Sequence, residues 1–145
     1  MRYLRTAAVF IQQTEEELLT EYKIITMSTR AQIRFATRES GQSFNQHASA
    51  IHAQFYVHHD GYPEGLGIQI AESLISYQKI NNWEIEELYH THGDLDYIYY
   101  VWQAMGKETY ISIFEDASAF TDGKDRCIFV GTPLELINKY EYNDR

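Results

Sequence analysis

Three consecutive runs rich in Tyr, Ile, Val, Phe and Trp fill the C-terminal third of the chain, and they limit the fold more than any other feature. Aromatic and β-branched residues favour strands, and the linkers between these runs contain glycine, which is typical of turns. Strands joined by such short linkers pair as antiparallel neighbours. The sequence therefore predicts a three-stranded meander formed by LDYIYYVWQA (95–104), ETYISIFED (108–116) and RCIFVGT (126–132).

Two runs nearer the N-terminus alternate between apolar and polar residues, as expected of strands with one buried face. The first run covers residues 28–35, and the second covers residues 50–59. The polar stretch 36–49 separates them. We predict an antiparallel hairpin with a long connection. Its apolar face contains Ala31, Ile33, Phe35, Ile51, Ala53, Phe55 and Val57, and its polar face contains Gln32, Arg34, His52, Gln54, Tyr56 and His58.

Helical spacing follows the hairpin. Apolar residues from Leu66 to Tyr77 recur every three or four positions, which predicts an amphipathic helix that ends near residues 79–82. The stretch WEIEELYHTHGD (83–94) predicts a second, shorter helix with an acidic outer face. The stretch TPLELINKYEY (132–142) predicts a last helix with Thr132 as its N-cap.

This order of elements predicts an α+β fold: a single antiparallel sheet of about five strands, made of the hairpin and the meander, with helices packed on one face. A chain of 145 residues is long enough for one such domain. We assign the domain to residues 27–145, because Met27 opens MSTRAQIRF, which reads as a natural beginning. Residues 1–26 are then either a leading helix or an N-terminal extension from a misassigned start codon.

Charge and cysteine content limit the function. A formal net charge of −9 disfavours nucleic acid as the main ligand, because it repels phosphates. Cys127 is the only cysteine, so no intrachain disulfide forms, and we expect a cytoplasmic protein. No apolar stretch reaches the roughly 18 residues that span a bilayer. We therefore expect a soluble acidic protein without a membrane partner.

The seam QFYVHHDGYPEGLG (54–67), between the second strand and the first helix, is the candidate site. Asp60 and Gly61 suit a turn in which the carboxylate accepts backbone N–H bonds and the glycine takes a positive φ. The N–H groups that open the helix suit a bound anion. The same residues also suit a corner that only redirects the chain, and the residues alone favour this reading.

Pairing of the first two strands brings Arg30, near the start of one, toward Asp60, at the end of the other. We predict that they meet as a clamp with His58 beside them. Such a clamp has two possible roles: a structural one, in which it fixes the corner, and a functional one, in which it binds a small anion. The ligand-binding candidates are Arg30, His58, Asp60, Gly61, Tyr62, Glu64, Gly65 and Gly67.

Four residues are weak candidates for metal ligands: His58, Asp60, His90 and His92. Their spacing matches no defined zinc motif, so we assign neither a metal nor another cofactor. Cys127 reads as a core-facing, inert cysteine. No catalytic residue is assigned, and enzymatic activity is the less favoured alternative.

The stretches MSTRAQIRF and FYVHHDGYPEGLG resemble a family of small uncharacterised proteins of bacteriophages, prophages and bacteria. Members begin with a Ser-Thr-Arg-Ala stretch and carry an aromatic residue, His-x-Asp-Gly-Tyr and often Pro-Glu-Gly. Val57 departs from the pattern, because a basic residue often stands there. The resemblance implies a phage context without a known activity. The matching residues are Ser28, Thr29, Arg30, His58, Asp60, Gly61, Tyr62 and Pro63.

We therefore expect an accessory protein of phage or mobile-element type that binds a partner protein or a small anionic ligand through the corner at residues 58–67. The alternative is a small hydrolytic enzyme that depends on a metal or on His58 and Asp60. A closed, hydrogen-bonded corner favours the first function, and convergence of His58 with Asp60 on an open pocket favours the second. The ligand, the partner and the choice between monomer and homo-oligomer stay open.

Overall fold

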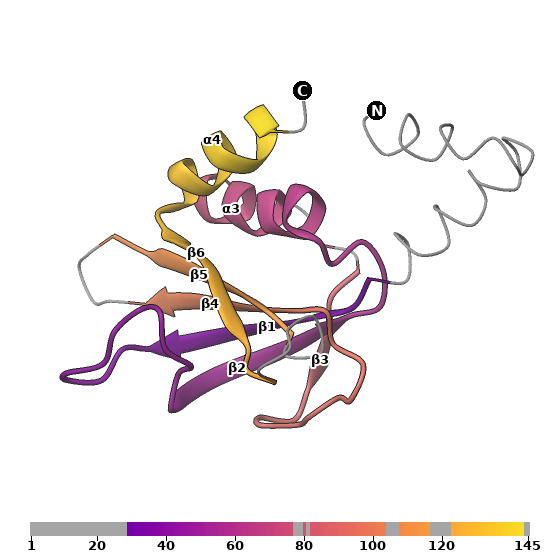
Figure 1. Cartoon of the computed structure of the whole chain (residues 1–145), viewed down its shortest axis with the longest axis vertical. Helices are drawn as coiled ribbons and strands as arrows, with labels where there is room; N and C mark the ends of the chain where they lie inside the picture. Colours follow the sequence, from indigo (N-terminus) through magenta and orange to yellow (C-terminus); the bar gives the residue numbers. More distant parts are fainter. Residues whose placement is uncertain (1–28, 77–79, 81, 104–107, 117–122, 144–145) are drawn as a thin grey trace, which may run out of the picture.

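In the computed structural model of this protein, six strands form one mixed sheet with the order β3-β2-β1-β4-β5-β6 (Figure 1). The structure describes residues 29–76, 80, 82–103, 108–116 and 123–143, so the segment 1–26 lies outside the described residues. The strands are β1 (Ala31–Thr37), β2 (Ala50–Val57), β3 (Glu84–Glu86), β4 (Tyr97–Gln103), β5 (Tyr110–Glu115) and β6 (Arg126–Gly131). The helices are η1 (Pro63–Gly67), α3 (Ile68–Ile75) and α4 (Pro133–Asn143).

The predicted hairpin and the predicted meander are both confirmed. Strands β1 and β2 are antiparallel, with Ala31 opposite Val57. Strands β4, β5 and β6 are antiparallel in chain order. The α+β class is therefore correct: the hairpin lies where the alternating pattern indicated, and the meander lies where the runs of aromatic and β-branched residues indicated.

The prediction of a wholly antiparallel sheet is wrong, because β1 and β4 pair in parallel. The chain between β1 and β4 runs from residue 38 to residue 96, which is long enough for the connection that parallel neighbours need. Strand β2 brings it back to the end of the sheet where β1 begins. Residues 58–96, which include η1, α3 and β3, then join the end of β2 to the start of β4 beside Ala31. The hairpin and the meander thus join edge to edge through their first strands.

The predicted helix at residues 83–94 is also wrong. Glu84, Ile85 and Glu86 form the short edge strand β3, which pairs with β2. Ile85 lies opposite Phe55, and Glu86 lies opposite Gln54. The alternation of Glu84, Ile85 and Glu86 suits a strand, and contacts across the sheet decide the outcome over helix propensity.

Helices α3 and α4 lie side by side over one face of the sheet, as predicted (Figure 1). Thr132 caps α4 as expected, because its hydroxyl accepts a hydrogen bond from the Glu135 N–H while the Glu135 carboxylate accepts one from the Thr132 N–H. The main core fills the space between these helices and the sheet. It includes Ile33, Val57, Leu66, Ile70, Tyr99, Val101, Ile111, Ile113 and Leu136.

The opposite face of the sheet carries a second apolar cluster under the connection 38–49, which we call the strap. Trp102 is 1% exposed, and its Nε1 donates a hydrogen bond to Ser112 Oγ at 2.7 Å. Ser112 Oγ in turn donates to the Phe44 carbonyl, and the Phe44 ring packs edge-on against Trp102. Tyr100 and Trp102, on this face of β4, are therefore buried under the strap.

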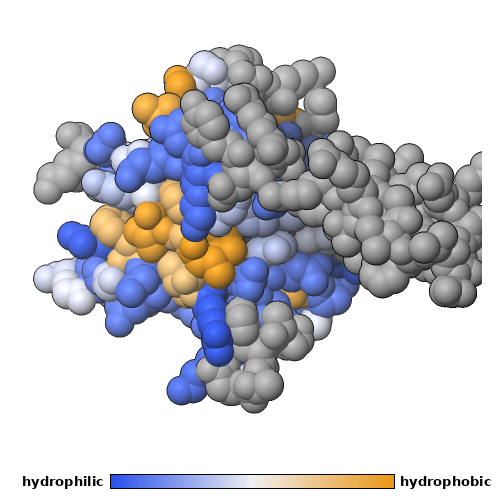
Figure 2. Space-filling model, turned by 45° about the horizontal axis from the view of Figure 1, so that its top comes forward, coloured by the Kyte–Doolittle hydropathy of each residue, from blue (hydrophilic) through white to orange (hydrophobic). Residues whose placement is uncertain are grey.

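Some hydrophobic side chains remain on the surface. Val130 on β6 and Leu134 on α4 are exposed, and Figure 2 shows hydrophobic side chains gathered on the face where these two elements lie.

Cys127 on β6 is half-buried, and burial raises the pKa of its thiol. Among the described residues, no helix has both the length and the apolar character needed to cross a membrane.

Gly61 packs directly against the start of β1. A methyl group at this position would lie 2.9 Å from the Ala31 Cβ and 3.0 Å from the Thr29 carbonyl oxygen. We expect Gly61→Ala to lower the free energy of unfolding by about 1–3 kcal/mol, because overpacking forces the backbone to shift. Urea denaturation measures this change.

Gly93→Ala is the matched control, because a methyl group at Gly93 meets nothing within 4 Å. We expect it to change the free energy of unfolding by less than about 0.5 kcal/mol. Equal stability of the Gly61→Ala and Gly93→Ala proteins would contradict the close approach of the corner to β1.

Candidate metal centre

The predicted approach of the corner to β1 is confirmed for the backbone. The Gly61 N–H donates to the Thr29 carbonyl at 3.0 Å. The predicted side-chain clamp is not formed, because the Arg30 guanidinium pairs with Asp94, with Nε 3.1 Å from Oδ2. The segment around Asp96 causes this difference, since its backbone N–H donates to the Arg30 carbonyl at 2.8 Å and brings Asp94 alongside.

The corner itself is closed by internal hydrogen bonds. The N–H groups of Gly65 and Leu66 both donate to the Tyr62 carbonyl, so these donors serve the chain and not an external anion. The Tyr99 hydroxyl donates to the Gly61 carbonyl at 2.6 Å. The positive φ expected at Gly61 occurs instead at Asp60, where φ is 58°.

The remaining corner candidates differ in exposure. Gly67 is buried against Leu136 and Tyr99, while Tyr62 and Glu64 are half-buried. Asp60 is exposed. His58 is also exposed and pairs with Glu84, with Nε2 3.0 Å from Oε2, so its carboxylate partner is not Asp60. The corner residues therefore do not converge on one point.

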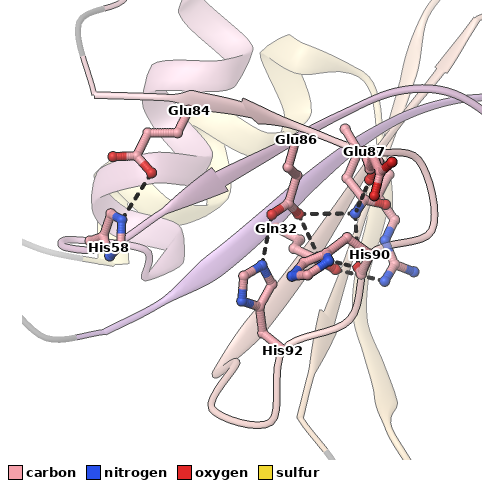
Figure 3. A network of polar contacts seen from close by, with 9 residues as sticks. Gln32, His58, Glu84, Glu86, Glu87, His90 and His92 are labelled. Carbon is pink, nitrogen blue, oxygen red and sulfur yellow. Dashed lines mark hydrogen bonds and ion pairs between the residues drawn. The ribbon is translucent and has the colours of Figure 1, made fainter.

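A tighter group of chemically active side chains lies beside the corner, on the strap-side face of the sheet. Glu86, His90 and His92 place one ligand atom each within 4.8 Å of the others (Figure 3). His90 and His92 were sequence candidates, and Glu86 was missed because its segment was predicted as a helix. We call these three residues the triad.

Two fully buried glutamines hold the Glu86 carboxylate in place. Gln32 Nε2 donates to Glu86 Oε1 at 2.8 Å, and Gln54 Nε2 donates to the same oxygen at 2.9 Å. The two donors come from the central strands β1 and β2. The carboxylate of an edge strand is therefore fixed by the rigid part of the sheet.

The same glutamines hold the backbone of His90. Gln32 Nε2 donates to the His90 carbonyl at 2.7 Å, and Gln54 Nε2 donates to it at 2.9 Å. This role of Gln54 costs stability, because its buried Oε1 has no hydrogen-bond partner in the described structure. Both ends of the segment from Glu86 to His90 are thus anchored, while the His90 ring stays exposed.

Arg34 fixes the orientation of Gln32. Its Nη2 donates to Gln32 Oε1 at 2.6 Å, which leaves the Gln32 amide nitrogen facing Glu86 and His90. Its Nη1 donates to the Tyr100 hydroxyl at 2.7 Å. Arg34 is a half-buried cation on the polar face predicted for the hairpin, and its part in the site was not predicted from the sequence.

His92 completes the triad. Its Nε2 donates to Glu86 Oε2 at 2.7 Å, and its ring stacks on Tyr56 with centroids 4.0 Å apart. Burial opposes ionisation of Glu86, but hydrogen bonds from His92, Gln54 and Gln32 outweigh it and lower the pKa of the carboxyl below its ordinary value. Glu86 is therefore a carboxylate at neutral pH.

The triad fits a small divalent cation. An ion bound at about 2.1 Å in tetrahedral geometry places its ligand atoms about 3.4 Å apart. Glu86 Oε2 and His92 Nε2, now 2.7 Å apart, must separate slightly, while the widest pair must close from within 4.8 Å. The exposed ring of His90 can make this movement without disturbing the core.

Comparison with known proteins adds nothing to this geometry: no family model matches the chain, and no curated protein or solved structure gives a significant match. The functional assignment therefore rests on the arrangement of the side chains. Membership in the phage family stays a prediction from the two matching stretches.

Proposed function

We propose that the protein binds a divalent transition-metal ion of the zinc type through Glu86, His90 and His92. The convergence of their ligand atoms within 4.8 Å carries this proposal. One carboxylate and two imidazoles form a ligand set that zinc accepts. Mg²⁺ and Ca²⁺ prefer oxygen ligands, so the two imidazoles disfavour them.

Three protein ligands leave one coordination position of a tetrahedral ion to water or to a substrate, which is typical of catalytic zinc sites. An ion held in this way would supply a Lewis acid and an acidified water. We therefore favour metal-dependent hydrolysis over a mechanism based on His58 and Asp60, whose side chains have separate surroundings.

Equilibrium dialysis against Zn²⁺, Co²⁺ and Mg²⁺ tests the proposal. We expect about one Zn²⁺ or Co²⁺ ion to bind per chain, with no binding of Mg²⁺ at the same concentration. Bound Co²⁺ should show the strong visible absorption of a site with fewer than six ligands. Failure of both Zn²⁺ and Co²⁺ to bind would refute the proposal.

Gln54→Met tests the support of the triad. The substitution preserves side-chain length but removes the donor to Glu86 and His90, and we expect Zn²⁺ affinity to fall about 10- to 100-fold. Competition with a chromophoric zinc chelator measures the affinity. Gln103→Met, at an exposed position at the end of β4, is the matched control and should keep wild-type affinity. Equal affinity of the two variants would show that Gln54 does not position the ligands.

We propose binding of a partner protein as a second function, in line with a phage accessory role. His58, His59 and Asp60 are exposed, and His58 contacts the edge strand β3 through Glu84. Ile85 on that strand is 77% exposed, and an exposed apolar side chain on an edge strand suits a protein contact. Sedimentation velocity tests a second copy of the chain as the partner, with concentration-dependent dimerisation as the expected result.

A further inference from the structure

We infer that the metal centre recognises a small oxyanion, either a carboxylate or a phosphate group, with the Arg30 guanidinium as its second contact. This inference rests on the proposed binding of a metal ion by the triad. It adds the class of ligand. It also assigns a binding role to Arg30, which was a candidate from the sequence, without requiring contact between Arg30 and Asp60.

Arg30 lies at the rim of the triad. It precedes β1 by one residue and stands two positions before Gln32, which holds Glu86. Side chains two positions apart on an extended chain lie on the same side, about 6–7 Å from each other. Tyr56 links the two groups, because its ring stacks on His92 with centroids 4.0 Å apart and the nearby Arg30 guanidinium acts electrostatically on its hydroxyl.

A carboxylate already sits beside Arg30. Asp94, two residues after His92, pairs with the guanidinium at 3.1 Å, and the two side chains are 37% and 54% exposed. Exposed ion pairs of this kind contribute little to stability, so an external oxyanion can replace Asp94 at small cost. Asp94 therefore indicates the geometry and the charge of the group that Arg30 can bind.

The surrounding negative charges make binding of the anion depend on the bound metal ion. Glu84, Glu86, Asp94 and Asp96 lie around this rim, and the chain carries a formal net charge of −9. A guanidinium alone meets strong competition from these carboxylates. A bound divalent cation neutralises Glu86 and offers a coordination position to an oxygen ligand, so the ion and Arg30 can hold the oxyanion together.

Visible absorption of the Co²⁺-loaded protein provides the test, with sodium acetate and inorganic phosphate titrated separately to distinguish the two kinds of oxyanion. We expect a saturable change of the Co²⁺ spectrum with at least one of them. Arg30→Gln should weaken binding of that anion about tenfold, since it loses a charged bidentate donor, while Co²⁺ affinity is retained. Asp94→Asn should strengthen anion binding. Arg126→Gln, on the opposite edge strand β6, is the matched control.

The outcomes separate the two proposals. If the protein does not bind Co²⁺, metal binding fails and this inference fails with it. If Co²⁺ binds but neither anion changes its spectrum, the oxyanion site is refuted and metal binding stands. The oxyanion site is refuted equally if the Arg30→Gln protein binds the anion as tightly as the Arg126→Gln protein does.

Discussion

The His90→Ala variant is expected to bind Zn²⁺ about a hundredfold more weakly than the wild-type protein. Zinc sites with four protein ligands bind with about 10–16 kcal/mol, or about 3 kcal/mol per ligand, and about 1.4 kcal/mol corresponds to a tenfold change in affinity. The His90 ring is exposed, and the buried glutamines contact its carbonyl group and not its imidazole. The substitution therefore removes a ligand while the anchored backbone stays in place.

Competition with a zinc chelator measures this loss, and far-ultraviolet circular dichroism checks the fold. His59→Ala is the matched control, because His59 is an exposed histidine outside the triad. Its Zn²⁺ affinity should equal that of the wild-type protein. If His90→Ala binds Zn²⁺ as tightly as His59→Ala does, the ion is bound elsewhere and the triad is not the metal centre.

Trp102→Ala is expected to lower the free energy of unfolding by about 3–5 kcal/mol, the usual cost of removing a large aromatic side chain from a core. Trp102 is buried, and it connects β4 to Ser112 on β5 and to Phe44 in the strap. Its loss leaves a cavity and removes the packing surface of the strap. Urea denaturation followed by circular dichroism measures the change.

Domains of this size have a total stability of about 5–15 kcal/mol, so Trp102→Ala can leave little folded protein. Trp102→Phe keeps a ring in the cluster and should cost about 1–3 kcal/mol through lost volume and the lost hydrogen bond to Ser112. Ile85→Ala removes an exposed side chain and should cost less than about 0.5 kcal/mol. A Trp102→Phe protein as stable as Ile85→Ala would show that the second cluster does not hold the fold.

The local patterns in the sequence were sufficient to predict the hairpin and the meander. Alternation of apolar and polar residues reports which face of a strand is buried, and it depends only on neighbouring positions. Pairing of β1 with β4 depends on contacts between distant residues, such as Arg34 and Tyr100, which are 66 positions apart. No local pattern encodes that choice, so the parallel pair was not predicted.

The site was predicted in part for the same reason. His90 and His92 stood out as ligand types, but Glu86 was hidden in an acidic stretch assigned to a helix. The alternation of Glu84, Ile85 and Glu86 was the signal for a strand, although three residues give it little weight. Gln32 and Gln54 were correctly placed on the polar face of the hairpin. Their burial was not foreseen, because it depends on how the segment from Glu86 to His90 covers that face.

The corner illustrates the limit of a motif. Gly61 does meet the start of β1, so the two stretches that carry the phage resemblance lie together. Their side chains nevertheless take other partners: Asp94 for Arg30, and Glu84 for His58. Proximity of two backbone segments follows from strand pairing, whereas the choice of partner depends on a third segment that the motif does not contain.

The parallel pairing of β1 with β4 also affects how the chain folds during its synthesis on the ribosome. Strand β1 can pair with β2 soon after both have been synthesised. Its other neighbour, β4, is complete only when synthesis reaches Gln103. Until then one side of the nascent hairpin presents unpaired backbone groups, which invite association with other chains. Closure of so long a loop also slows folding. Strand β1, which carries Gln32 of the candidate centre, therefore gains its second neighbour only after β4 has been synthesised.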